Sequence, residues 1–225
     1  MPDLALVIGN KNYSSWSMRP WVALRQAGIP FREIQLWFDE NGHPNGIVQY
    51  SPTRQVPVLL VNDEPVWDSL AICETVAQLI PEKRLWPSDT RAQALARSIC
   101  AEMHAGFRSL RSAMPMNIRA SLPGKGMSPA VGRDIERVTA LWNDCRHRFG
   151  ADGPLLFGRF TAADAYYAPV VMRFITYAVA LPQPAQDYVE AVRKLSAVTE
   201  WMEAARRETA FVAADEPYAD VNSKR

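Results

Sequence analysis

The first part of the chain alternates between short apolar runs and helical spacing of apolar residues. The run Leu4-Ala5-Leu6-Val7-Ile8 is typical of a buried strand, and residues 31–36 form a second strand-like segment. Between them, the apolar spacing of residues 18–26 predicts a helix that stops at Gly28. A strand, a helix and a strand in about 35 residues predict a βαβ unit with parallel pairing.

A second set of elements follows up to residue 80. Residues 38–55 are rich in Gly, Pro and Asn and predict an irregular connection. Residues 57–61 and 66–67 flank the turn-like segment 62–65 and predict a hairpin. An apolar helical segment then covers residues 68–80, and Pro81 ends it. The order βαβ and then ββα predicts one sheet with helices on its faces.

The remainder of the chain is helical almost throughout. Four stretches combine helical spacing with few breakers, and the last of them predicts one or two shorter helices: 89–114, 129–149, 161–181 and 185–207. We therefore expect an α+β protein of two domains, with an α/β domain at 1–80, a linker at 81–88 and a helical domain at 89–225. The polar tail after Asp215 is expected to be frayed.

Charge supports the division and narrows the partners. The 225 residues carry a formal net charge of +1, which gives no strong field for nucleic acid or an anionic membrane. Residues 1–80 carry 5 Lys/Arg against 8 Asp/Glu, a net of −3, whereas residues 81–225 carry 20 against 16, a net of +4. The two predicted domains therefore differ in net charge as well as in predicted secondary structure.

Cysteine and histidine usage indicates the compartment and excludes some chemistry. The chain has three Cys and three His, with no CxxC pair, so neither a zinc site nor dithiol redox chemistry is expected. A sparse, odd cysteine count fits a reducing compartment. The N-terminus lacks the basic and apolar regions of a signal peptide, and Pro169 and Arg173 interrupt the apolar run at 165–181. We expect a cytoplasmic protein without a membrane partner.

A serine-rich hexapeptide, Ser14-Ser15-Trp16-Ser17-Met18-Arg19, lies between the first predicted strand and the first predicted helix. Hydroxyls at this point lie beside the free N–H groups of the helix N-terminus, where an anion is favoured. Serine is also a preferred N-cap, so capping is the simpler interpretation of the same residues. Without a GxSxG motif, a serine nucleophile is not indicated.

Two further pairs lie at the ends of predicted elements. Val56-Pro57 precedes a strand, and Asp68-Ser69 opens a helix. With a cis peptide bond, Val56 could pair through its backbone with an extended ligand, although trans bonds are far more common. Asp68 and Ser69 can cap the helix, or they can bind the ammonium and carboxylate of a ligand.

The order and spacing of these three features, followed by a helical half, resembles the cytosolic glutathione transferase family over nearly the whole chain. The serine-rich run is most similar to the zeta class, whose signature is Ser-Ser-Cys-Ser-x-Arg and whose members are glutathione transferases and maleylacetoacetate isomerases. Residues 158–165, Gly-Arg-Phe-Thr-Ala-Ala-Asp-Ala, are similar to the helix-six signature of the family. There, Thr161 is expected to cap a helix and Asp164 to reach back to the N–H of the cap.

The resemblance implies a thioredoxin-like N-terminal domain that holds glutathione, a helical domain that shapes an electrophile pocket, a cis bond at Pro57 and a homodimer. It implies that Ser14 or Ser15 donates a hydrogen bond to the glutathione sulfur; the zeta pattern favours Ser14, and theta-like relatives favour Ser15. Six residues are expected at the glutathione site: Trp16, His43, Gln55, Val56, Asp68 and Ser69. Val56 is expected to pair through its backbone with the cysteinyl part, Asp68 and Ser69 to bind the γ-glutamyl end, and His43 or Gln55 to reach the glycyl carboxylate. Trp16 stands where the zeta signature has cysteine, which leaves the isomerase activity open; its indole is expected to pack over substrate or to narrow the pocket.

The electrophile pocket is expected to include Phe107, Arg108 and Arg111. The two arginines share one helix face and would form a cationic wall that attracts anionic electrophiles or a glutathione carboxylate, although solvated or dimer-interface arginines explain them as well. Phe107 could equally belong to the core. Conjugation of glutathione to a small electrophile is the leading functional interpretation. The alternatives are isomerisation of the maleylacetoacetate type, glutathione-dependent reduction of peroxides or disulfides, and a non-catalytic binding module.

Overall fold

The computed structural model describes residues 2–219 and contains a four-stranded mixed sheet in the order β2-β1-β3-β4. The strands are β1 (Leu4–Ile8), β2 (Arg32–Gln35), β3 (Val58–Val61) and β4 (Glu64–Val66). β1 is parallel to β2 and antiparallel to β3, and β3 is antiparallel to β4. The predicted βαβ unit and the predicted hairpin are both confirmed.

Two helices belong to this part of the chain, α1 (Ser15–Gln26) and α2 (Ser69–Leu79). α1 begins three residues before the predicted start because the side chain of Ser14 caps it and accepts from the N–H of Ser17. Asp68 caps α2 in the same way, through the N–H of Leu70. The capping interpretation of both motifs is therefore correct, and it does not exclude a role in binding.

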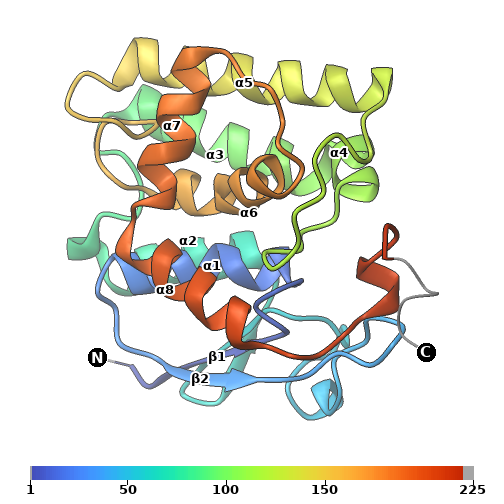
Figure 1. Cartoon of the computed structure of the whole chain (residues 1–225). Helices are drawn as coiled ribbons and strands as arrows, with labels where there is room; N and C mark the ends of the chain where they lie inside the picture. The colour runs from blue at the N-terminus through green and yellow to red at the C-terminus, as the bar shows by residue number, and fades with distance from the viewer. Residues whose placement is uncertain (1, 220–225) are drawn as a thin grey trace.

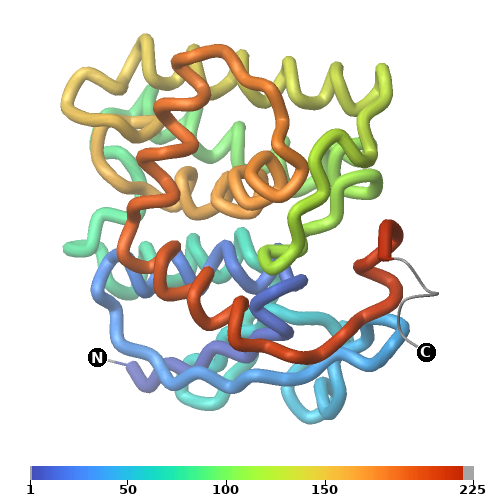
Figure 2. Tube along the Cα trace, viewed as in Figure 1, coloured from blue at the N-terminus to red at the C-terminus, as the bar shows by residue number. Residues whose placement is uncertain are grey.

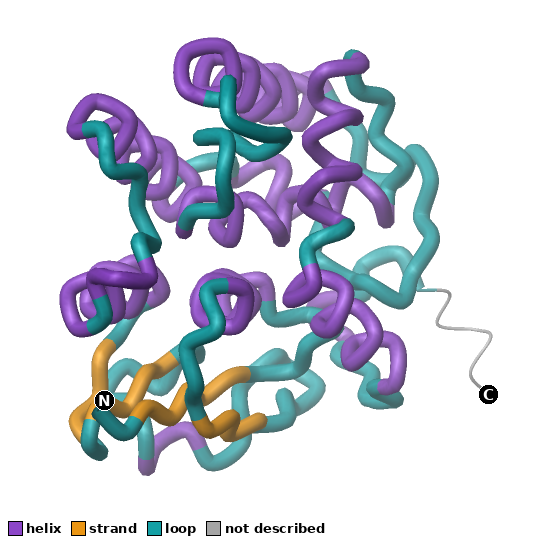
Figure 3. Tube along the Cα trace, turned by 90° about the vertical axis from the view of Figure 1, so that its left-hand side faces the viewer, coloured by secondary structure: helices purple, strands orange, loops and turns teal. Residues whose placement is uncertain are grey.

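The second part of the chain is helical (Figure 3). Its helices are α3 (Thr90–Ala105), α4 (Arg108–Ala113), α5 (Pro129–Phe149), α6 (Ala162–Thr176), α7 (Gln183–Arg193) and α8 (Ser196–Arg207). The helix predicted over 89–114 is broken at Gly106 and Phe107, because Phe107 adopts a left-handed conformation with φ of 55°. A β-carbon at Gly106 would lie 2.7 Å from the carbonyl oxygen of Glu102, so this turn requires glycine.

One hydrophobic core runs through both parts. In Figure 1, α1 and α2 lie between the sheet and helices α3 to α7, and α8 lies beside α1. The core joins β1 and β3 to α1, α2 and all helices from α3 to α8, with Trp142, Trp201 and Tyr166 among its largest buried side chains. The domain boundary at residue 80 stays a prediction, since side chains from both sides of it share this core.

The capping box that the sequence predicts at α6 is present. Asp164 is buried, and its Oδ2 accepts from the N–H of Thr161 at 2.9 Å, while its Oδ1 accepts from the N–H of Leu156 at 3.0 Å and from the Tyr188 hydroxyl at 3.2 Å. Burial raises the pKa of Asp164 to about 6, against the opposing effect of these donors. The motif anchors the central helix of the second half.

The segment after α8 returns to the sheet side of the molecule (Figure 2). Glu208 accepts from the side chain of Gln35, and the N–H of Ala214 donates to the carbonyl of Glu40. Tyr218 donates to the carbonyl of Ala113, so the tail is ordered at least to that residue. The rest of the predicted frayed tail, from residue 220, lies outside the described residues. Within residues 2–219, no helix combines the length and apolar character that crossing a membrane requires.

Candidate functional site

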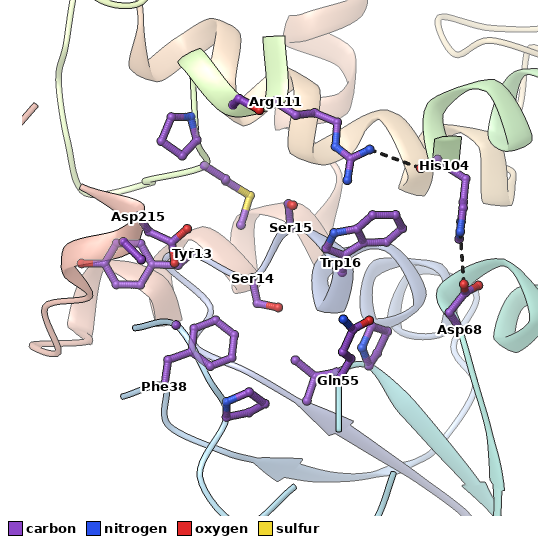
Figure 4. Close-up of a pocket in the computed structure, with 18 of the residues that line it drawn as sticks. Tyr13, Ser14, Ser15, Trp16, Phe38, Gln55, Asp68, His104, Arg111 and Asp215 are labelled. Carbon is purple, nitrogen blue, oxygen red and sulfur yellow. Dashed lines mark hydrogen bonds and ion pairs between the residues drawn. The ribbon is translucent and has the colours of Figure 1, made fainter. Parts of the chain in front are cut away.

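A cleft of about 1060 Å³ opens between the sheet and the helical part of the chain (Figure 4). It is lined by the start of α1, the loop after β2, the segment before β3, the ends of α3 and α4, α6, and the C-terminal segment. Small-molecule sites usually occupy about 300–1,000 Å³, so this cleft has room for two small substrates. It brings together eight of the residues that the sequence selected: Ser14, Ser15, Trp16, Gln55, Val56, Asp68, Arg108 and Arg111.

Ser14 is the N-cap of α1, and its hydroxyl points into the cleft, toward the side where Gln55 and Phe38 lie (Figure 4). Its Oγ donates to the Oγ of Ser17 at 2.7 Å and accepts from the N–H of Ser17 at 3.4 Å. The N-terminal peptide groups of α1 add their positive dipole end at the same place. This corner of the cleft therefore favours a negatively charged atom.

Ser15 lies on the opposite side of the helix start, and its hydroxyl points toward the helical part (Figure 4). Its Oγ accepts from Nη2 of Arg173 at 3.3 Å. Arg173 is buried in α6 and also donates to the carbonyls of Met114 and Pro169, at 2.8 Å and 3.2 Å. The two adjacent serines thus face different halves of the cleft.

Tyr13 is the third hydroxyl at this point, and the sequence had not selected it. Its OH is engaged by the C-terminal segment: its one proton is shared between Glu216 and the carbonyl of Ala210, and its oxygen accepts from Arg119 at 2.7 Å. Burial, together with Glu216, raises the pKa of Tyr13 to about 12. Its proton is therefore committed to the C-terminal segment, and the candidates for a hydroxyl that contacts a ligand are the serines.

Trp16 lies between two guanidinium groups. The Cζ of Arg19 is 4.1 Å from the centre of the indole and that of Arg111 is 4.8 Å away, while the ring of His104 meets the indole edge-on at 4.9 Å. Arg111 also donates to the carbonyls of His104 and Gly106. This stack fixes the indole as a wall of the cleft.

The arginines of the cleft lack carboxylate partners. Arg108, Arg111 and Arg173 line it, and none of them makes an ion pair within residues 2–219. Burial and neighbouring arginines lower the pKa of Arg173 to about 9. Asp215 lines the same cleft, and burial raises its pKa to about 6, with Arg173 opposing that shift. This half of the cleft is therefore electropositive at neutral pH.

The opposite end of the cleft holds Val56 and Asp68. The Val56-Pro57 peptide bond is cis, as the resemblance implied, and neither the N–H nor the carbonyl of Val56 hydrogen-bonds to the part of the chain that the structure describes. Oδ2 of Asp68 lies 3.1 Å from Nε2 of His104. An extended ligand could pair with the Val56 backbone here.

Three selected residues lie outside the cleft lining. His43 is exposed and lies 3.5 Å from Asp39. Ser69 is buried, and its hydroxyl bonds to that of Tyr166 at 2.9 Å. The side chain of Phe107 is buried in the core.

Arg173, Asp215 and His104 line the cleft, although sequence reasoning had not assigned them to it. Arg173 interrupts the apolar run that follows Asp164 in α6, and a charge inside such a run is the sequence signal that could have pointed to it. Asp215 carried no local signal.

A mixed α/β unit joined to a helical unit, with a cleft at the start of α1 between them, is the architecture of a two-domain protein with a thioredoxin-like N-terminal part. The family model for the "Glutathione S-transferase, N-terminal domain" matches residues 13–79. The model for the "Glutathione S-transferase, C-terminal domain" matches residues 93–204. The chain therefore belongs to the glutathione S-transferase family.

Solved structures of similar fold include a glutathione transferase homolog from Burkholderia gl BGR1 with bound glutathione, with a TM-score of 0.69 at 20% identity, covering 92% of this chain and 100% of that one. A tau-class glutathione S-transferase from mango has a TM-score of 0.68 at 19% identity, covering 91% and 96%. Structural likeness at such low identity shows a shared fold alone.

Curated relatives match over shorter stretches. A "Probable maleylacetoacetate isomerase" from Caenorhabditis elegans is 26% identical over 128 residues, 56% of this chain and 59% of that protein. The maleylacetoacetate isomerase of Rattus norvegicus is 28% identical over 102 residues, 44% and 47% of the two chains. The match thus spans about half the length of these relatives.

Proposed function

We propose that this protein is a glutathione transferase that activates the glutathione thiol at the start of α1 for attack on a small electrophile. The observation that carries the proposal is the Ser14 hydroxyl at the N-cap of α1, directed into a cleft that the Val56 backbone also lines. Family membership and the glutathione bound by the Burkholderia homolog support glutathione as the co-substrate.

The residues of the cleft fit this tripeptide. The unpaired N–H and carbonyl of Val56 match the backbone of a cysteinyl residue, which has one donor and one acceptor to offer. Asp68, at the start of α2, is placed to take the γ-glutamyl ammonium, and Gln55 lines the cleft beside Val56. The hydroxyl of Ser69 is buried and hydrogen-bonded to that of Tyr166, so Ser69 acts here only as the first residue of α2 and not through its side chain.

The forces at this corner are large enough for thiol activation. A free cysteine thiol has a pKa of about 8.5, so only about 3% is thiolate at pH 7. Lowering the pKa by about two units needs about 2.7 kcal/mol of preference for the thiolate. One hydrogen bond to a charged group contributes about 1.5–3 kcal/mol, and the helix N-terminus adds about 0.3–1 kcal/mol.

Ser14 is the better candidate for the hydrogen-bond donor to sulfur. Its hydroxyl points to the side of the cleft that holds Gln55, next to Val56, whereas that of Ser15 points toward the helical half and is held by Arg173. A cysteinyl residue anchored on Val56 presents its sulfur to the Ser14 side. In this mechanism, the thiol loses its proton to solvent, Ser14 stabilises the thiolate, and the sulfur is the nucleophile.

The second substrate binds on the helical side of the cleft, against Trp16, Arg108 and Arg111. The unpaired arginines favour an electrophile that carries negative charge. The buried position of Phe107 makes it a support for this wall through the start of α4. We further propose a homodimer in the cytoplasm, on the strength of the family resemblance.

Isomerisation of the maleylacetoacetate type is the second candidate, because the curated relatives carry that name and the cleft is electropositive. Trp16 occupies the position of the zeta-class cysteine. A preparation that conjugates other electrophiles and leaves maleylacetoacetate unchanged would remove this candidate.

The proposal is tested by retention on immobilised glutathione and by a conjugation assay, with the Ser14→Ala variant beside the unmodified protein. We expect both proteins to bind the column and the variant to turn over more slowly at neutral pH. Absence of binding by the unmodified protein would exclude the proposed function. Binding without any conjugation across a panel of electrophiles would favour the non-catalytic alternative.

A further inference from the structure

Ser17 lies one helical turn after Ser14, is fully buried and does not line the cleft. Its Oγ accepts two hydrogen bonds, from the Oγ of Ser14 at 2.7 Å and from the N–H of Gly9 at 3.1 Å. Ser17 therefore connects the end of β1 to the hydroxyl that faces the cleft.

The count of donors and acceptors allows a second arrangement of this pair, with the hydrogen bond reversed. A hydroxyl has one proton to donate and two lone pairs. In the structure, the Ser14 proton is given to Ser17, so Ser14 has no proton to offer to a ligand. Within residues 2–219, the Ser17 hydroxyl has no acceptor for its own proton, and both lone pairs of its oxygen accept hydrogen bonds.

We propose that Ser17 is a positioning residue that reverses this hydrogen bond when a thiolate forms beside Ser14. Ser17 then donates to Ser14, which donates to the sulfur, and Gly9 continues to donate to Ser17. The chain runs from the Gly9 N–H through both hydroxyls to the anion. Only two O–H bonds rotate, no covalent bond changes within the protein, and the thiol proton leaves to solvent.

This chain strengthens the final donor. Each hydroxyl that accepts a hydrogen bond becomes a better donor, because the successive dipoles align and polarise one another. With the reversed bond, Ser14 accepts from Ser17 while it donates to sulfur. A Ser14 without Ser17 behind it would lose that support, and the bound thiol would be less acidic.

The position of the Gly9 amide is itself fixed by close packing. A β-carbon on Gly9 would lie 2.3 Å from the ring of Phe38, so the backbone at the end of β1 fits tightly against this ring. Phe38 is held in turn by its N–H, which donates to Oδ1 of Asn10 at 2.7 Å. The first donor of the chain is thus set by the sheet.

The inference rests on the proposed function, and its test separates the two. The pKa of the bound glutathione thiol is measured from the ultraviolet absorbance of the thiolate in Ser17→Ala, Ser17→Thr, Ser14→Ala and the unmodified protein, with glutathione affinity measured by calorimetry. We expect Ser17→Ala to raise the bound-thiol pKa by about half a unit to one unit, because one hydrogen bond is lost. Ser17→Thr keeps the hydroxyl and should restore the original pKa.

Glutathione affinity of the neutral thiol form should change by less than about threefold in Ser17→Ala, since Ser17 does not touch the ligand. If Ser17→Ala does not fold, Ser17→Cys replaces it, and its weaker donor should give an intermediate pKa. A raised pKa in Ser14→Ala with an unchanged pKa in Ser17→Ala or Ser17→Cys would overturn the positioning role and leave the proposed function standing. An unchanged pKa in Ser14→Ala would instead overturn the serine mechanism itself.

Discussion

The guanidinium of Arg173 holds the hydroxyl of Ser15, with 3.3 Å between Nη2 and Oγ, and thereby joins the helical half of the chain to the first turn of α1. Arg173 is buried, has no carboxylate partner within residues 2–219, and shares the cleft with Arg111 and Arg108. The second-substrate side of the cleft therefore presents positive charge around a fixed serine.

This charge predicts a preference for an anionic electrophile. We expect Arg111→Gln to lower kcat/KM for a chloronitrobenzoate by about tenfold, as loss of about 1.4 kcal/mol of charge interaction implies. The matching chloronitrobenzamide, which has the same shape without the charge, should change by less than about twofold. Equal losses for both substrates would show that Arg111 acts through structure alone; Arg91→Gln, an exposed substitution outside the cleft, is the control.

The ionisation of Asp215 should make this preference for an anionic electrophile depend on pH. Burial raises its pKa to about 6, so it is neutral below that value and adds a negative charge to the cleft above it. The ratio of kcat/KM for the benzoate to that for the benzamide should therefore fall as the pH rises through about 6. Ionisation of the glutathione thiol affects both reactions equally, so it cancels in this ratio. In Asp215→Asn, the fall should disappear, and its persistence would assign it to another group.

Replacing Asp164 should lower the stability of the fold without changing the residues of the cleft. Its carboxylate is buried and satisfies the N–H groups of Leu156 and Thr161 and the hydroxyl of Tyr188. Asp164→Ala leaves these donors unpaired and should lower the free energy of unfolding by about 3 kcal/mol, measured by urea denaturation. Asp144→Ala removes an exposed pair with Arg148 and should cost less than about 0.5 kcal/mol. A similar loss in both variants would contradict the anchoring role of the capping box.

Much of the fold could be predicted because local signals and long-range packing agree. The apolar run of β1 and the helix at 129–149 match the structure, since each is delimited by its own residues: Gly9 after the strand, Ser128 and Gly150 around the helix. The break between α3 and α4 was missed because Phe107 adopts a left-handed conformation that its residue type rarely adopts.

The parts of the site at the ends of helices and strands could be predicted from the sequence. The parts formed where distant segments of the chain meet could not. Ser14, Val56 and Asp68 stand at the ends of elements, so their order along the chain carried the resemblance. Asp215 reaches the cleft only because Tyr13 and Arg119 bind the segment before it, and the sequence shows nothing of those contacts locally. Ser69 was expected to offer its hydroxyl to a ligand, and the structure pairs that hydroxyl with the one of Tyr166 in α6.

The pKa of the bound glutathione thiol in matched serine variants tests the central claim most directly. The free thiol has a pKa of about 8.5, and we expect the pKa of the bound thiol to be about two units lower on the unmodified protein. Ser14→Ala should raise the bound value by about one unit or more, while Ser15→Ala, whose hydroxyl faces Arg173 on the other side, should shift it by less than about 0.3 units. An unchanged value in Ser14→Ala, or a larger shift in Ser15→Ala than in Ser14→Ala, would contradict the role assigned to Ser14.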